Sequence, residues 1–176
     1  MTAVAEWHED NGAATGTPAK GATRTKTGDN NSRSDFVAVD SATATKATSR
    51  IIAGQNSFHK YRFVKFSGTF NEVSSAKFAH TAGSLGAGLS IVGKVTSTYA
   101  TPARDALAGA TNISTPTQIN NGMNVQFSST GPEGAAVNKL TAAGYSQYLV
   151  TQLQTQSTAA KGDIGDMTMT LQWNEN

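Results

Sequence analysis

The stretch Met167–Asn174, MTMTLQWN, decides the fold class of this chain. Its apolar side chains stand at every second position, and threonine, glutamine and asparagine occupy the positions between them. Successive side chains of a β-strand point to opposite faces, so this alternation is typical of a strand with one buried and one solvated face.

The same alternation recurs along most of the chain after residue 34. It predicts strands at 36–39, 50–52, 58–70, 75–80, 89–99, 123–128, 145–154 and 167–174. In 58–70 the apolar parity switches between Phe63 and Val64, which predicts a β-bulge. In 145–154 both faces carry bulky side chains, which predicts a central strand covered on both sides. We therefore expect an all-β fold, a β-sandwich or jelly roll of about seven or eight antiparallel strands with little helix.

Two short helical segments are expected between these strands. Thr101-Pro102 fits the start of a single turn, with threonine as N-cap and proline at the first helical position. The stretch 130–133, TGPE, matches a capping box in front of a helix over residues 135–143.

Composition divides the chain into two parts. Ala, Thr, Gly, Ser and Asn make up more than half of its 176 residues, and the first 34 residues contain only three large apolar side chains, Met1, Val4 and Trp7. Such a segment buries too little surface to offset an ordering cost of about 1–2 kcal/mol per residue. We therefore expect an extended polar N-terminal arm over residues 1–34, with a flexible tail as the alternative. A β-sandwich domain over residues 35–176 is expected to fold without this arm.

The residue types on which enzymes depend form no known motif in this chain. Cysteine is absent, and His8, His59 and His80 lack the spacing of a zinc site. The glycine-rich stretch 83–88 does not match a phosphate-binding loop. The chain has no run of ~18 apolar residues, so no membrane span is expected. We predict a protein that is not an enzyme, holds no cofactor and no metal, and does not enter a membrane.

Basic residues are concentrated between positions 20 and 65. Lys60 and Arg62 share one face of strand 58–70, and we expect this face to be solvated. A basic region of this kind could suit nucleic acid or an acidic protein surface, but its charges are spread out and lack interleaved aromatic residues, and we expect no direct contact with nucleic acid. Trp7 is expected to anchor in a partner's pocket. The predicted partner-binding residues are Trp7, Lys20, Arg24, Lys26, Arg33, Lys46 and Arg50.

Five stretches of the chain carry a family resemblance: AGQNSFHKY at 53–61, FSGTFN at 66–71, HTAG at 80–83, GYSQYLVTQL at 144–153 and TMTLQWNE at 168–175. Together they resemble β-rich virion structural proteins of tailed bacteriophages. The resemblance implies a capsid decoration (cement) protein that bridges neighbouring capsid subunits, or else a tail, neck or baseplate protein.

The resemblance also implies partners and a location. The partners would be the major capsid protein or other virion subunits. The chain itself would form a homo-oligomer, with a trimer as one option. Its location would be the virion, assembled in the cytoplasm of the bacterial host.

Two further functions stay open at this point. A carbohydrate- or receptor-binding β-sandwich would need exposed aromatic side chains, for which Tyr61, Tyr99 and Tyr148 are the candidates. A hydrolase acting on cell-wall polymers would need two carboxylates in a cleft, and no spacing in the sequence indicates such a pair.

Overall fold

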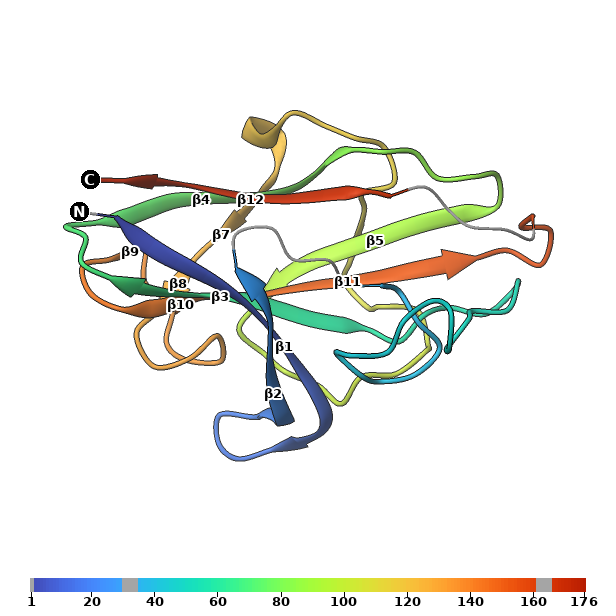
Figure 1. Ribbon diagram of the computed structural model, residues 1–176, viewed down its shortest axis with the longest axis horizontal. Helices are drawn as coiled ribbons and strands as arrows, with labels where there is room; N and C mark the ends of the chain where they lie inside the picture. The colour runs from blue at the N-terminus through green and yellow to red at the C-terminus, as the bar shows by residue number, and fades with distance from the viewer. Residues whose placement is uncertain (1, 30–34, 161–165) are drawn as a thin grey trace.

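The computed structural model describes residues 2–29, 35–160 and 166–176. Over these residues the chain is all-β, as expected, and its strands form two antiparallel sheets in a sandwich-like arrangement (Figure 1). The only helical element among them is a 3-10 turn, η1, at Ile119–Asn121. No helix in this described part of the chain has the length and apolar character needed to cross a membrane.

Among the described residues the larger sheet has eight strands, in the order β2-β1-β3-β11-β5-β6, with β10 beside β3 and β8 beside β10. The smaller sheet has four strands, in the order β12-β4-β7, with β9 beside β4. The larger sheet contains β1 Ala3–Thr15, β2 Lys20–Asp29, β3 Lys60–Gly68, β5 Leu89–Thr96, β6 Thr111–Asn112, β8 Phe127–Ser128, β10 Gly144–Ser146 and β11 Tyr148–Thr155. The smaller sheet contains β4 Val73–Ala82, β7 Met123–Val125, β9 Lys139–Leu140 and β12 Thr168–Glu175.

The long alternating stretches form strands because each of them buries one row of side chains. In β4, for example, Ala76, Phe78 and His80 are all buried. The two shortest candidates, 36–39 and 50–52, do not form strands. The first of them is held by single hydrogen bonds, such as the one from the Ala38 N–H to the Ser49 carbonyl at 3.0 Å.

Strand β3 does not contain the expected bulge. It pairs with β1 in unbroken register over eight residue pairs. Tyr61 and Phe63 belong to an apolar cluster on one face of the sheet, whereas Val64 and Phe66 belong to a cluster on the other. The switch of apolar parity in the sequence therefore reflects a strand buried on both faces.

Two apolar clusters cover opposite faces of the larger sheet. The main cluster combines residues of both sheets and includes Phe66, whose ring meets Phe127 and Trp173 edge-on. The second cluster is rich in aromatic residues and includes Tyr148. Strand β11 contributes Leu149 to the main cluster and Tyr148 to the second one, which confirms the expected central strand with two covered faces.

The expected helices are absent from the regions predicted to contain them. Residues 101–102 are irregular, and Lys139 and Leu140 pair with β4 as strand β9. Val137 forms a β-bridge with Phe127. The capping-box prediction fails because the Glu133 carboxylate points to Arg24, 3.0 Å away, and does not cap a helix.

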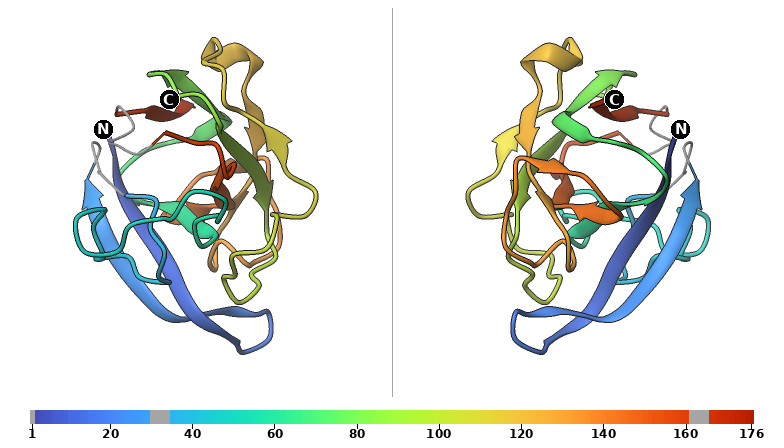
Figure 2. Two further views of the ribbon diagram at one scale, coloured as in Figure 1. Left: turned by 90° about the vertical axis from the view of Figure 1, so that its right-hand side faces the viewer. Right: turned by 90° about the vertical axis from the view of Figure 1, so that its left-hand side faces the viewer.

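The expected N-terminal arm is instead a β-hairpin built into the larger sheet. Strand β1 pairs with β2 on one side and with β3 on the other, and Figure 2 shows β1 and β2 curving together along one side of the molecule. Ala3 and Ala5 are buried, and the Ala3 N–H donates to the Glu175 carboxylate at 2.7 Å. The prediction counted only large apolar side chains, whereas alanine, backbone hydrogen bonds and paired charges order this segment.

Candidate functional site: the polar junctions of the N-terminal hairpin

Strand β1 presents polar side chains to both faces of the larger sheet, because successive residues point in opposite directions. His8 lies on the face of the second cluster, where its ring stacks on Phe63 with centroids 5.4 Å apart. Trp7 lies on the other face and packs against the main cluster. The polar run EWHED at 6–10 is thereby split between two sides. No group of three or more His, Asp or Glu residues that could hold a metal ion occurs among the described residues.

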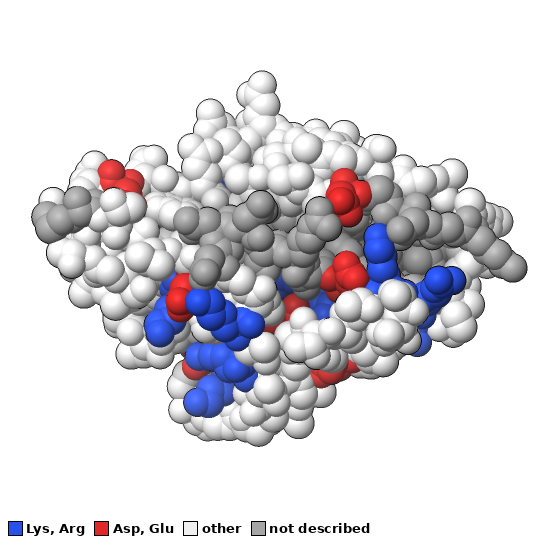
Figure 3. Space-filling model, in the orientation of Figure 1, with Lys and Arg blue, Asp and Glu red and all other residues white. Residues whose placement is uncertain are grey.

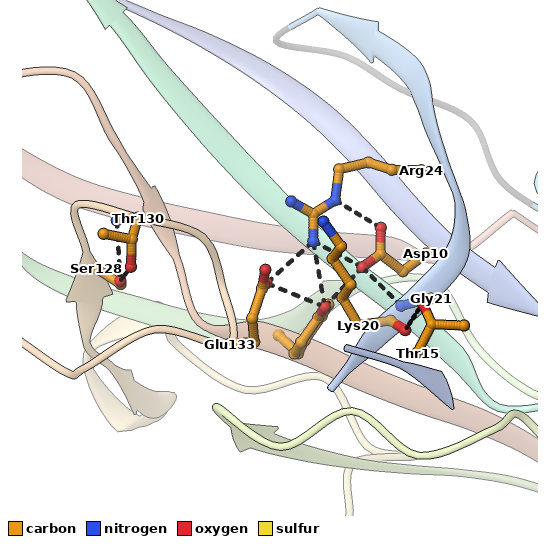
Figure 4. A network of polar contacts seen from close by, with 9 residues as sticks. Asp10, Thr15, Lys20, Gly21, Arg24, Ser128, Thr130 and Glu133 are labelled. Atoms are coloured by element: carbon orange, nitrogen blue, oxygen red, sulfur yellow. Dashed lines mark hydrogen bonds and ion pairs between the residues drawn. The ribbon is translucent and has the colours of Figure 1, made fainter. Parts of the chain in front are cut away.

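The buried carboxylate of Asp10 is the centre of a set of contacts that we call the Asp10 cluster, which consists of Asp10, Arg24, Glu133 and Tyr148. Figure 4 shows Asp10, Arg24 and Glu133 turned toward one another. Arg24 donates to both oxygens of Asp10, from Nε and Nη2, at 2.8 Å each. The same Nη2 lies 3.0 Å from Glu133 Oε2. The Tyr148 hydroxyl donates to Asp10 at 2.6 Å. One guanidinium therefore holds two carboxylates that lie far apart in the sequence.

The environment of the Asp10 cluster shifts the pKa values of Arg24 and Tyr148 upward. Burial alone would lower the pKa of Arg24, but the hydrogen bonds and charges of Asp10 and Glu133 raise it. Burial, together with the hydrogen bond to Asp10, raises the pKa of Tyr148. Arg24 therefore stays charged and Tyr148 stays neutral at physiological pH.

A second set of contacts, the Glu9 cluster, lies on the opposite face and consists of Glu9, Asn11, Asp40, Lys60 and Arg62. Glu9 Oε1 accepts hydrogen bonds from Lys60 Nζ at 2.9 Å and from Asn11 Nδ2 at 3.0 Å. Glu9 Oε2 accepts from Arg62 Nε at 3.4 Å. Glu9 is 0% exposed and Lys60 is 1% exposed. The solvated face expected for Lys60 and Arg62 is therefore wrong for Lys60, which is buried, and Arg62 is only partly exposed, because the neighbouring strand β1 contributes the Glu9 carboxylate to this face.

Burial acts in opposite directions on the two charges of this pair. It would raise the pKa of Glu9, but attraction from Arg62 and Lys60 outweighs it, so the pKa of Glu9 lies below its usual value. Burial lowers the pKa of Lys60, and the charge of Glu9 only partly opposes this. Lys60 is thus a buried amine that gives up a proton more readily than an exposed lysine does.

Segment 35–59 closes over the Glu9 cluster. The Asp40 carboxylate accepts hydrogen bonds from the Gly12 N–H and from Asn11 Nδ2, both at 2.7 Å. Lys60 Nζ also donates to the Ser41 carbonyl at 2.8 Å. The hairpin is therefore tied to β3, to β11 and to two loops by charge-assisted hydrogen bonds. Because Glu9 and Asp10 are both 0% exposed, this arrangement favours a structural role over a hydrolytic carboxylate pair, which must reach its substrate.

Three of the predicted partner-binding residues, Lys20, Arg24 and Lys26, lie together on β2. Figure 3 shows lysine and arginine side chains gathered over the hairpin. Two of the three are also engaged within the protein: Arg24 belongs to the Asp10 cluster, and Lys26 Nζ lies 2.8 Å from the Glu6 carboxylate.

The other four predicted residues do not share one position. Lys46 and Arg50 are exposed in the segment between β2 and β3. Arg33 lies outside the described residues. Trp7 is half-buried against the main cluster, so part of its side chain packs within the protein and its role as an anchor for a partner stays a prediction.

Strand β2 forms one edge of the larger sheet. Within the described ranges β1 is the only strand that pairs with β2, so no strand covers the other side of this ten-residue strand. Such an edge is a template for a strand from another chain, and lysine and arginine on it discourage unspecific pairing. The same charges favour an acidic partner.

A shallow depression of about 440 Å³ lies over β4 and β12, beside η1. It is lined by threonine and glutamine side chains and by the neighbouring segment 116–119. The hydroxyls of Thr81 and Thr170 lie 2.6 Å apart across the two strands. Its lining contains no ionisable side chain, so it offers hydrogen bonds to a ligand but no acid or base.

The three tyrosines considered for carbohydrate binding are not at the surface. Tyr61 is 2% exposed, Tyr99 3% and Tyr148 0%, and their rings contact one another. Two of their hydroxyls donate hydrogen bonds within the protein: Tyr99 to the Gly12 carbonyl at 2.8 Å and Tyr148 to Asp10 at 2.6 Å. These residues therefore do not form a stacking surface for sugars.

Sequence reasoning missed the members of both clusters other than Arg24, although one signal for them was present. Lys60 and Arg62 stand at every second position of the strand together with Val64 and Phe66, so their side chains point to the same face. If that face is covered along the whole strand, Lys60 and Arg62 are covered with it. Lys60 and Arg62 were expected to be exposed to solvent because no oppositely charged partner for them is nearby in the sequence. Glu9, the partner of Lys60, is 51 residues away.

Comparison with protein-family models, with curated proteins and with solved structures found no match to this chain.

Proposed function

We propose that this chain is a structural protein of a tailed bacteriophage virion, acting as a capsid decoration (cement) protein that bridges neighbouring capsid subunits. The proposal is supported by the resemblance of residues 50–175 to virion structural proteins. The observation that carries it is the hairpin, which is fastened to the body by two ion-pair clusters around the buried carboxylates of Glu9 and Asp10 and which places β2 at one edge of the larger sheet.

The proposed contact is the addition of a strand to β2. A strand of a capsid subunit would add to the larger sheet along its β2 edge, and side chains near this edge would select it. Lys20 is exposed on β2, and Arg50 is exposed in the segment that follows it. An acidic subunit surface would meet these charges, and the chain would act as one copy of a homo-oligomer on the virion.

The test uses particles that lack this chain and purified protein added back to them. We expect the wild-type protein to co-sediment with the particles and to raise the temperature at which they release DNA. The double variant Lys20→Glu/Arg50→Glu should bind less at the same protein concentration. Lys139→Glu is the control, because Lys139 is exposed on β9 of the smaller sheet. Equal binding by all three proteins would count against a contact at β2.

The same preparation separates the alternative locations. Binding to isolated tails and not to heads would identify a tail, neck or baseplate protein. The carbohydrate-binding alternative is not favoured by the positions of Tyr61, Tyr99 and Tyr148, all of which are buried. Glycan-array binding by the purified protein would reinstate it.

A further inference from the structure

A lysine, a glutamate and an asparagine meet in the interior of this protein at the junction of β1 and β3. Lys60 is 1% exposed, Glu9 0% and Asn11 6%. One oxygen, Glu9 Oε1, accepts from Lys60 Nζ at 2.9 Å and from Asn11 Nδ2 at 3.0 Å. Because both nitrogens donate to the same oxygen, the distance between Lys60 Nζ and Asn11 Nδ2 cannot exceed the sum of these two hydrogen-bond lengths.

The strand register places these two side chains opposite one another. Strand β1 pairs with β3 up to Asp10 and Tyr61. Asn11 follows Asp10, and Lys60 precedes Tyr61, so the next step of the same antiparallel register faces Asn11 with Lys60. Opposed residues have Cβ atoms about 4.5–5.5 Å apart, a span that a lysine side chain covers with ease.

The environment favours a reaction between these groups. Lysine becomes nucleophilic when burial favours its neutral form, and Lys60 is held out of solvent beside a carboxylate that can take its proton. The carbonyl oxygen of Asn11 is buried and has no hydrogen-bond partner among the described contacts. Asp40 holds the Asn11 amide nitrogen at 2.7 Å. The reactants are thus fixed in place, which removes most of the entropic cost of their encounter.

We propose that Lys60 and Asn11 form an intramolecular amide cross-link, with Glu9 carrying the protons. Lys60 Nζ passes a proton to Glu9 and attacks the Asn11 carboxamide carbon as a free amine. Glu9 delivers this proton to Asn11 Nδ2, the Cγ–Nδ2 bond breaks, and ammonia leaves. Glu9 then takes the surplus proton from the new amide nitrogen and releases it to ammonia. One C–N bond forms, one breaks, an ammonium ion is lost and Glu9 ends as a carboxylate.

This cross-link would join the N-terminal hairpin to the centre of the larger sheet by a covalent bond. The hairpin would then resist extraction even when the ion pairs of both clusters are broken. The inference stands on the geometry of the three residues and is independent of the proposed location on a virion.

The Asn11-Gly12 sequence offers a competing reaction that also loses ammonia. In that reaction the Gly12 amide nitrogen attacks the Asn11 side chain and forms a succinimide without Lys60. The structure disfavours it, because the Gly12 N–H is hydrogen-bonded to Asp40 at 2.7 Å. A test must still separate the two products, since they have the same mass.

The experiment measures the intact mass of the folded full-length chain and the peptides it releases. We expect wild-type protein to weigh one ammonia less than its sequence. Proteolysis should yield one branched peptide that contains both Asn11 and Lys60. Lys60→Arg and Glu9→Gln should keep the full sequence mass, whereas Lys139→Arg, a matched change at an exposed lysine, should lose ammonia as the wild type does.

Two results would overturn the proposal. One is a folded wild-type chain that keeps its full mass after prolonged incubation, which needs no variant to interpret. The other is a loss of ammonia that persists in Lys60→Arg and yields linear peptides that hydroxylamine cleaves after Asn11, which identifies the succinimide. Circular dichroism of each variant shows that its mass refers to folded protein.

Discussion

At one end of β3, Val64 and Phe66 are buried against the smaller sheet, whereas at the other end Lys60 is buried and Arg62 is partly buried, where they contact the neighbouring strand β1 and segment 35–59. All four side chains lie on the same face of one strand. The apolar end is covered by aromatic rings, such as that of Phe127, whose centroid lies 5.7 Å from the ring centroid of Phe66. The charged end is covered by the carboxylate of Glu9, which serves both cations.

The difference shows how a chain poor in large apolar residues can still bury a long strand. An apolar contact is stabilised in proportion to the area removed from water and tolerates many partners. A buried charge is stable only with a specific partner, and the loss of that partner is costly. The apolar end of β3 is therefore insensitive to which chain segment covers it, whereas the charged end requires the N-terminal hairpin.

The largest effect is expected from removal of the hairpin. A chain without residues 2–34 would leave the buried Lys60 and the partly buried Arg62 without the Glu9 carboxylate and Tyr148 without that of Asp10, and it would expose the edge of β3. We expect no cooperative thermal unfolding transition, measured by circular dichroism and one-dimensional NMR. A truncated chain with a sharp transition and dispersed amide signals would show that the charged end does not depend on the hairpin.

At the charged end, Glu9→Ala is expected to reduce the free energy of unfolding by about 3–5 kcal/mol, because it leaves buried cations unpaired. Urea denaturation followed by fluorescence measures the change. Glu72→Ala, which removes the carboxylate of the exposed pair with Lys139, is the control and should leave stability nearly unchanged. Similar losses for the two variants would contradict the contrast between buried and exposed pairs.

At the apolar end, Phe66→Ala is expected to cost a similar amount, about 3–5 kcal/mol, through lost burial and the cavity left behind. The same urea series measures it. The free energy of unfolding that Phe66→Ala loses should hardly change with pH, unlike the loss caused by Glu9→Ala. Val4→Ala, at a side chain that is half exposed, should change stability by less than about 0.5 kcal/mol.

Tyr148→Phe should have a smaller effect. It removes a hydroxyl that donates to the buried carboxylate of Asp10 at 2.6 Å, and hydrogen bonds to charged groups contribute about 1.5–3 kcal/mol. Tyr99→Phe removes a hydroxyl that donates to the neutral Gly12 carbonyl, so about 0.5–1.5 kcal/mol is expected. Thermal denaturation of the two variants side by side tests the order, and a greater loss for Tyr99→Phe would reverse the assignment.

The smallest effect is expected from mild acid. Because the folded state lowers the pKa of Glu9, this group contributes stability above the usual glutamate pKa of about 4.3 and loses it as the pH falls through its lower folded value. Urea denaturation of wild-type protein and of Glu9→Gln between neutral and acidic pH measures the contribution. The variant should show a shallower loss of stability in acid, and parallel curves would exclude Glu9 as a contributor.

The sequence predicted most of the strands but not the position of its first 34 residues. The alternation in β4 indicated correctly that Ala76, Phe78 and His80 are buried, and the bulk on both faces of 145–154 indicated a strand covered on both sides, because each pattern is long enough to be read locally. The arm and the two helices were predicted wrongly. The hairpin has few large apolar residues and is ordered by partners on β3 and β11, and Glu133 binds Arg24, 109 residues away, and caps no helix.

By itself the sequence determined an all-β chain, since side chains on a pleated strand alternate and the alternating pattern is visible without any partner. Only the tertiary structure decided that Lys60 and Asp10 are interior residues and that Arg62 is partly buried. A methyl group is stabilised by almost any apolar neighbour, so its burial follows from local pattern. A charge is stabilised in the interior only by a partner at hydrogen-bonding distance, and that distance is set by the folded chain.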